Sequence, residues 1–368
     1  MAATVFRWDL DKTYLVSHFE SLRQLIRIPF QKAEDKEAVP GVVPLIQSLR
    51  GRAVERGDRP SVFFLSASPP QIGGAIRDKL KLDGITYEGI TFKDQVRHLM
   101  RARFDVVREQ IGYKLEQLLV TALESEPGTR ELLFGDDWES DPFIYSLYAD
   151  IVAGKLTRER VVELLERAHV NKDFVARIAD LVASVRPAIV VDGIFILRQR
   201  PAAPVDLAAF GRRLVWFDNY FECSLALYAA GWLSTDGVAA VAEEVGLGPE
   251  DLAASFDAVD ERGRVDRAWL GAVANKLVGT GKMGRVSLGF APRRAAGAVR
   301  RAMGRTPAPY AGPVTVPEYA ELVERWSLRG RKEAAQAETA TGEARDAADA
   351  DEAADGSKGD RGLDDGGK

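Results

Sequence analysis

The 368-residue sequence contains a single cysteine, Cys223, which excludes an internal disulfide. This scarcity is typical of proteins from a reducing compartment. No apolar run approaches the roughly 18 residues of a membrane-spanning helix, and the first residues lack the basic and apolar regions of a signal peptide. We therefore expect a cytoplasmic protein without a transmembrane segment, an expectation compatible with peripheral membrane contact.

The sequence also lacks an excess of basic charge. Its formal net charge is −5, from 50 Lys and Arg against 55 Asp and Glu. Residues 331–368 hold 6 of the basic and 11 of the acidic side chains, so 44 of each sign remain over residues 1–330. This neutral balance argues against general affinity for nucleic acid, and we expect no nucleic-acid partner.

Large apolar side chains are nearly absent from residues 331–368, which are rich in Ala, Glu, Asp and Gly. Such a segment cannot bury enough surface to offset its ordering entropy, so we predict a disordered acidic tail. The rest of the chain can bury a large core. After Pro201 and Pro204 the composition becomes alanine-rich, which predicts a first domain over 1–200 and a mostly helical domain of unknown role over 205–330. The oligomeric state stays open.

Short apolar segments alternate with helical patterns in the first 200 residues. The apolar segments are 5–8, 61–65, 129–134 and 187–198, the last with an irregularity at Asp192-Gly193. Helical spacing separates them, including a helical insertion at about 155–187. This alternation predicts an α/β fold, in which a parallel sheet has helices on both faces and the strand ends meet at one edge.

Polar side chains follow three of these strands, and a lysine begins a later helix. In chain order they are Asp9 and Asp11, Ser66 and Ser68, Lys114, and Asp136, Asp137 and Asp141. Each residue type has a plainer explanation, because Asp favours turns, Ser caps helices and most lysines are solvated. Ligands bind outside the carboxyl ends of strands in open α/β sheets, so the joint placement at these ends favours a site.

The order of these motifs resembles the haloacid dehalogenase superfamily of aspartate-nucleophile phosphatases. Its motifs are a strand ending in Asp-x-Asp-x-Thr, a strand ending in Ser or Thr, a helix-borne Lys and a strand ending in Gly-Asp. The closest similarity is to the actin-patch-associated phosphatidate phosphatase catalytic domain. That similarity rests on Pro40-Gly41, Ser66-Ala67-Ser68-Pro69, Lys114-Leu115-Glu116, and Gly135-Asp136 with Asp141 and Tyr145. It covers about residues 1–200 and implies a haloacid-dehalogenase-like, Rossmannoid sheet.

The resemblance implies a Mg-dependent phosphomonoester hydrolase. Asp9 would attack phosphorus to form an aspartyl-phosphate, and Asp11 would act as general acid and then general base. Ser66 would donate to a phosphoryl oxygen, while Lys114 would offset charge on the phosphate and on Asp9.

The resemblance also implies a set of metal ligands, and the sequence around them indicates substrate contacts. Hard carboxylate oxygens suit Mg, and the expected ligands are Asp9, Asp11, Asp136, Asp137 and Asp141. The choice between Asp137 and Asp141 stays open, because Trp138 stands where the family has a small residue. The expected substrate contacts are Thr13, Ser68, Arg97 and Arg101. The two arginines belong to a basic stretch over 93–108 that would steer an anionic substrate.

Two other interpretations stay open. Asp11-Lys12-Thr13 also resembles the Asp-Lys-Thr of ion-pumping ATPases, which would make Asp11 the nucleophile, but nothing in the sequence supports a membrane pump. The second alternative is a catalytically silent domain that serves as a metal-binding or protein-interaction module. The presence of both Asp9 and Asp11 favours the enzyme.

The segments between the motifs, at about 16–39 and 70–111, are too short for a large globular cap domain. We therefore expect an open site that admits a bulky phosphomonoester. A phosphorylated small molecule or a phosphatidate-like lipid headgroup would be the substrate.

Overall fold

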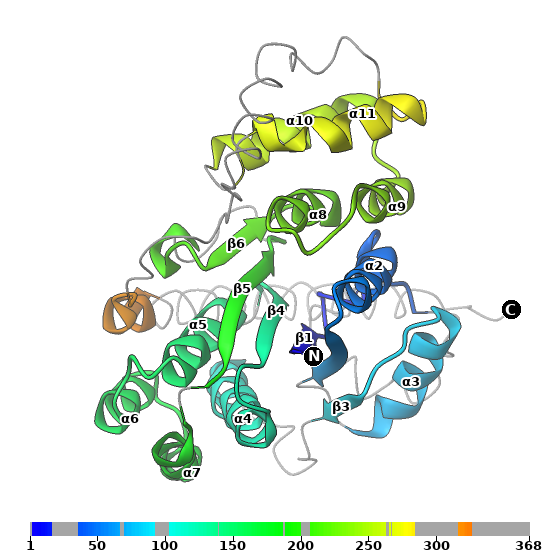
Figure 1. The fold of residues 1–368 in the computed structure, drawn as a ribbon. Coiled ribbons are helices and arrows are strands. Elements are labelled where there is room, and N and C mark those ends of the chain that lie inside the picture. Colours follow the sequence, from blue (N-terminus) through cyan, green and yellow to red (C-terminus); the bar gives the residue numbers. More distant parts are fainter. Residues whose placement is uncertain are drawn as a thin grey trace, which may run out of the picture.

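Six parallel strands form one sheet in the order β3-β2-β1-β4-β5-β6 (Figure 1). The strands are β1 (Ala3–Asp9), β2 (Arg59–Ser66), β3 (Gly89–Phe92), β4 (Arg130–Asp136), β5 (Val190–Leu197) and β6 (Leu214–Phe217). The expected α/β fold with a parallel sheet is therefore confirmed. Neighbouring parallel strands run in one direction, so their carboxyl ends share one edge of the sheet.

The structure is a computed structural model, and it describes a defined part of the chain. The described residues are 2–16, 36–66, 70–92, 103–138, 140–186, 188–199, 207–262, 265, 267–283 and 316–325. Ser68, Arg97, Arg101 and the acidic tail over 331–368 lie outside this part. The predictions made for them stay predictions.

Helices cover both faces of the sheet. The α-helices are α2 (Val42–Glu55), α3 (Gly73–Leu82), α4 (Arg103–Glu124), α5 (Asp141–Val152), α6 (Arg158–Arg167), α7 (Lys172–Ser184), α8 (Tyr220–Ala229), α9 (Thr235–Val245), α10 (Pro249–Glu261) and α11 (Gly271–Gly279). Short 3₁₀ helices occur at Pro70–Ile72, Leu207–Phe210 and Arg267–Leu270. None of the described helices is long and apolar enough to cross a membrane.

The sheet is buried on both faces because its central strands are apolar at successive positions. In β4, Phe134 packs on the face of α2, α3 and α8, whereas Leu133 packs on the face of α4 and α5. The helices α6 and α7 extend the α4–α5 side, while α10 and α11 lie outside α8 and α9 (Figure 1). The strands thus have a continuous hydrophobic layer on either side.

Three stacked aromatic rings join the central strands just before the edge that carries the polar residues. Trp8 of β1 lies 3.8 Å from Phe134 of β4, centroid to centroid, and the two ring planes differ by 3°. Phe134 in turn stacks on Phe195 of β5 at 5.0 Å. Cross-strand aromatic pairs stabilise a sheet and restrict its register. The stack therefore restricts the register of β1 against β4, and with it the position of Asp9 relative to Asp136.

The sheet continues beyond the stretch expected to form the first domain. Leu214–Phe217 forms β6, which pairs with β5, although residues 205–330 were expected to be mostly helical. Four residues are too few for the apolar run to stand out from an alanine-rich sequence. The predicted irregularity at Asp192-Gly193 is confirmed, because Glu131 and Leu132 pair with Val191 and Gly193 and Asp192 is left out of the register.

Candidate active site

The ends of β1, β2 and β4 bring most of the predicted site residues together. Asp9 is the last residue of β1 and pairs in register with Leu65, next to Ser66 at the end of β2. Asp136 ends β4, two residues after the Phe134 that pairs with Trp8. Asp9 is 1% exposed, and Ser66 and Asp136 are fully buried. Three separate strand ends therefore build one enclosed polar centre.

A buried lysine lies between two of the carboxylates. Lys114 of α4 donates from Nζ to Asp9 Oδ1 at 2.7 Å and to Asp141 Oδ1 at 2.6 Å. Both Lys114 and Asp141 are fully buried. The sequence had indicated that Lys114 lies at the start of a helix. The helix instead begins at Arg103, so Lys114 lies inside it. A buried ammonium of this kind needs the carboxylates, because an unpaired charge in the interior is costly.

Asp9, Asp136 and Asp141 form a group suited to a cation. Each offers a carboxylate oxygen, and the three oxygens lie within 4.8 Å of one another. Among the described residues, Asp11 and Asp137 fall outside this group. The geometry therefore favours Asp141 over Asp137 as the third carboxylate.

Thr13 and Asp11 complete the loop that follows β1. The Thr13 hydroxyl lies 3.3 Å from Asp9 Oδ2 and 3.4 Å from Asp136 Oδ2, and its one proton can be donated to either carboxylate. Ser66 donates its hydroxyl to Asp11 Oδ2 at 3.1 Å. Asp11 is half-buried, unlike the enclosed Asp9. Of these carboxylates, Asp11 is thus the one on the solvent side.

Asp137 has a different environment from its neighbours. Its Oδ1 accepts the backbone N–H of Gln199 at 2.8 Å, and its own N–H donates to Leu197 O at 3.1 Å. The next residue, Trp138, is 37% exposed, and its ring lies 3.4 Å from Lys12 Nζ. Asp137 therefore joins the end of β4 to the end of β5.

Gly135 allows Asp141 to approach the end of β4. A Cβ at this position would lie 2.4 Å from Asp141 Oδ2 and 2.8 Å from Tyr145 Cε2. The glycine of the Gly-Asp motif is thus explained by the space that the buried carboxylate occupies.

We expect Gly135→Ala to lower the free energy of unfolding by about 1–3 kcal/mol, because the added methyl group must displace Asp141 or Tyr145. Urea unfolding measures this change. Gly51→Ala is a matched control, since that glycine lies inside α2 with no atom within 4 Å of its added Cβ. Gly51→Ala should leave stability unchanged or raise it by about 0.5–1 kcal/mol. Equal stabilities of the two variants would contradict this account of Gly135.

Two buried tyrosines support the site from opposite sides. Burial raises the pKa of Tyr145 well above its ordinary value, and the Asp141 carboxylate adds to the shift. Burial likewise raises the pKa of Tyr220 well above its ordinary value, with smaller contributions from Cys223, Asp136 and Asp9. Both phenols therefore stay protonated. Tyr145 donates to Phe134 O at 3.4 Å, and Tyr220 of α8 donates to Thr13 O at 2.7 Å.

Sequence reasoning missed Tyr220 and Gln199. Tyr220 lies 207 positions from its partner Thr13, and Gln199 lies 62 positions from its partner Asp137. Both positions belong to stretches without a recognisable motif, so no local signal could have identified them.

The expected open site depends on two segments that are described only in part. Residues 17–35 and 93–102 lie outside the described residues. The described part of the segment at 70–111 forms α3, β3 and the first turns of α4, which belong to the sheet and its covering helices. The openness of the site stays a prediction.

Comparison with known proteins gives one family. Residues 8–157 match the family model described as the catalytic domain of phosphatidate phosphatase APP1. No curated protein and no solved structure matches the chain significantly. The matched range runs from the end of β1 to the region after α5 and contains every predicted site residue. The match agrees with the family expected from the motifs, and this part of the chain is similar to a phosphatase catalytic domain.

Proposed function

We propose that this phosphatase catalytic domain is Mg-dependent and hydrolyses a phosphomonoester through an aspartyl-phosphate on Asp9. The observation that carries the proposal is the position of Lys114 Nζ, within 2.7 Å of both Asp9 and Asp141 at a buried strand end. A carboxylate attacks an anionic phosphoryl group only when nearby positive charge offsets the repulsion. Lys114 offers that charge directly beside Asp9.

The charges of the residues fit a divalent cation. Asp9, Asp136 and Asp141 are three buried carboxylates, and Lys114 supplies one positive charge among them. Three buried carboxylates with oxygens within 4.8 Å of one another repel each other, and a divalent cation would relieve that repulsion. Three hard oxygen donors suit Mg, with Asp9, Asp136 and Asp141 as the side chains that would hold it. When bound, the metal would neutralise charge on the phosphoryl group.

Asp9 and Asp11 have environments that suit two different roles. In the first step an Asp9 oxygen forms a bond to phosphorus while the bond from phosphorus to the leaving oxygen breaks. Asp11 gives that oxygen a proton. In the second step a water molecule gives a proton to Asp11 and attacks phosphorus, which releases inorganic phosphate and restores Asp9. The half-buried position of Asp11 and its hydrogen bond from Ser66 support this assignment.

Lys114, Thr13 and Ser66 would prepare these two aspartates. Lys114 and Thr13 bind different oxygens of Asp9, so they hold the carboxylate in one orientation. Ser66 holds Asp11 in the same way and would turn its hydroxyl to a phosphoryl oxygen when substrate binds. Such fixed orientation of the reacting groups lowers the barrier.

The substrate that we propose is a phosphatidate-like lipid, or another bulky phosphomonoester. The description of the matching family names phosphatidate phosphatase, which supports this class. We further propose that the enzyme is cytoplasmic and reaches such a lipid by peripheral contact with a membrane.

Removal of the metal should abolish activity. We expect EDTA to lower the rate of phosphate release by about 100-fold or more, and excess Mg to restore it, because without the cation the clustered carboxylates would repel the phosphoryl group. Phosphate release from phosphatidate in mixed micelles measures the effect. A rate that EDTA leaves unchanged would contradict the metal dependence.

A substrate panel tests the function itself. Phosphatidate, sugar phosphates and nucleotides would be compared with the purified full-length chain in the presence of Mg. We expect hydrolysis of phosphatidate at the highest kcat/KM. Hydrolysis of none of these compounds would overturn the proposal in favour of a catalytically silent binding module.

A further inference from the structure

We propose that Gln199 is a positioning residue that holds the loop carrying Asp11 against the end of β5. This inference rests on the proposed function for its catalytic consequence, although the contact itself can be tested without activity. Gln199 lies two residues beyond β5 and outside the matched range 8–157. No motif of the sequence pointed to it.

The loop after β1 has an unusual backbone conformation at Lys12. Its φ is 62°, and the only other described non-glycine residue with positive φ is His169. A residue other than glycine keeps a left-handed backbone conformation only where surrounding contacts stabilise it. Lys12 stands between Asp11 and Thr13, so its conformation sets the direction of the proposed acid/base and of the hydroxyl that contacts Asp9.

Three of the contacts of Lys12 support this conformation, and each uses a different part of the residue. The backbone N–H donates to Leu15 O at 3.0 Å, and the ammonium lies over the Trp138 ring. The backbone carbonyl accepts a hydrogen bond from the side-chain amide of Gln199. Of these three, the bond from Gln199 is the one that ties the loop backbone to another strand end.

Gln199 binds a second site loop at the same time. Its backbone N–H donates to Asp137 Oδ1 at 2.8 Å, while its side chain reaches Lys12. One residue thus links the loop after β1 with the loop after β4. The relative position of these two loops determines how Asp11 faces a phosphoryl group held near Asp9 and Asp136.

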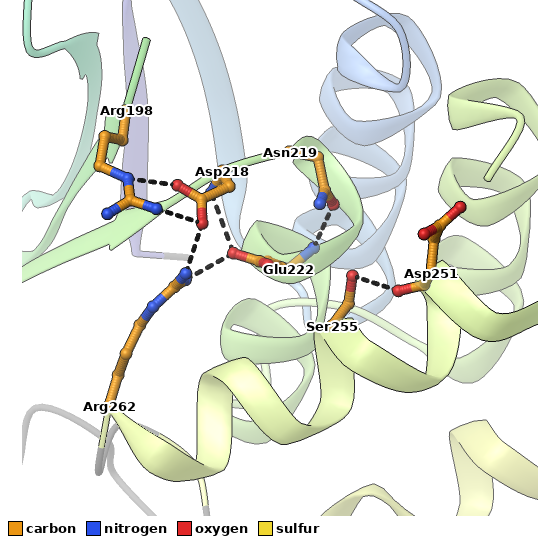
Figure 2. Close-up of polar contacts among 7 residues, drawn as sticks. All are labelled: Arg198, Asp218, Asn219, Glu222, Asp251, Ser255 and Arg262. Carbon is orange, nitrogen blue, oxygen red and sulfur yellow. Dashed lines mark hydrogen bonds and ion pairs between the residues drawn. The ribbon is translucent and has the colours of Figure 1, made fainter. Parts of the chain in front are cut away.

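A network of ion pairs holds the neighbouring residue Arg198 in place (Figure 2). Arg198 donates to both carboxylate oxygens of Asp218 at 2.5 and 2.7 Å, and its backbone N–H donates to Phe217 O at 2.8 Å. Arg262 at the end of α10 binds the same Asp218 at 2.6 Å and Glu222 at 2.5 Å. These contacts connect the segment that carries Gln199 to β6, α8 and α10. Gln199 therefore holds the loop after β1 from a position that is itself well restrained.

The experiment compares Gln199→Glu and Gln199→Ala with Gln47→Ala. Glutamate has the shape of glutamine but cannot donate to the Lys12 carbonyl, and alanine removes the contact without adding charge. Gln47 is the matched control, because it is also exposed and donates from its side chain to a backbone carbonyl, that of Asp83. Both substitutions at Gln199 are on the surface, so the variants should fold with unchanged melting temperature.

A general acid matters most when the leaving group is a poor one. We therefore expect both Gln199 variants to lower kcat for phosphatidate, whose leaving group is an alkoxide, about tenfold, with less loss for p-nitrophenyl phosphate and little change in KM. Gln47→Ala should match wild type on both substrates. Equal losses on the two substrates, or no loss, would overturn the positioning role.

Hydrogen–deuterium exchange gives a readout that does not require activity. Peptides that cover residues 10–15 should exchange faster in both Gln199 variants than in Gln47→Ala, because the loop loses its link to β5. Equal exchange in the three variants would overturn the inference, whatever their rates. A wild-type protein without phosphatase activity would instead refute the proposed function, and the exchange data would still decide whether Gln199 holds the loop.

Discussion

Asparagine at position 9 is expected to lower phosphomonoesterase activity by about a thousandfold or more. The amide keeps an oxygen that can accept the hydrogen bond from Lys114, but it is not a competent nucleophile toward phosphorus. The loss should appear in kcat, with a melting temperature close to that of wild type. Phosphate release under saturating substrate and Mg measures it.

Asp180→Asn is the control for this substitution. Asp180 is a highly exposed aspartate of α7, a helix that contributes no residue to the candidate active site. Its carboxylate lies 3.7 Å from the Arg158 guanidinium, which is a long distance for an ion pair. Its removal should leave the rate within about twofold of wild type, as for most surface substitutions. An Asp9→Asn protein as active as Asp180→Asn would rule out Asp9 as the nucleophile.

Lys114→Met is expected to lower the free energy of unfolding by about 3–5 kcal/mol in the absence of metal. The substitution removes the ammonium that donates to two buried carboxylates, Asp9 and Asp141, and so takes away positive charge beside them. Urea unfolding in EDTA measures this loss. Added Mg should recover part of the stability, because a cation that binds only the folded state stabilises it.

Lys282→Met is the comparison for Lys114→Met. Lys282 pairs with Glu243 at 2.9 Å on the surface, where the Lys282 side chain is partly exposed and the Glu243 side chain is largely exposed. Loss of such a pair should cost about 1 kcal/mol or less and should not respond to Mg. A Lys114→Met protein with wild-type stability in EDTA would contradict the electrostatic account of the site.

The sequence could predict the strand ends because each is marked locally. Trp8 precedes Asp9 and Phe134 precedes Gly135-Asp136, so in both places a buried apolar run gives way to acidic residues. Parallel topology then brings these residues to one edge, which requires no knowledge of distant contacts. The convergence of Asp9, Ser66, Lys114 and Asp136 was therefore within reach of sequence reasoning.

The contacts between segments that are distant in the sequence could not be predicted from it. Asp137 and Asp141 are equivalent as a sequence pattern, and it is the packing of Asp141 beside Gly135 and its hydrogen bond from Lys114 that distinguish them. The support from Tyr220 and Gln199 depends on how β5, β6 and α8 pack beside the loop after β1. The strand β6 was missed for a related reason, since its four residues are stabilised by pairing with β5 more than by their own pattern.

The central claim is that Asp9 carries the phosphoryl group during turnover, and chemical trapping tests it most directly. The full-length chain would be mixed with radiolabelled phosphatidate and Mg, quenched in acid within one turnover and digested for mass spectrometry. We predict label on the peptide that contains Asp9 and Asp11, assigned to Asp9 by fragmentation. Label on Asp11, or phosphate release without any labelled enzyme, would contradict the account.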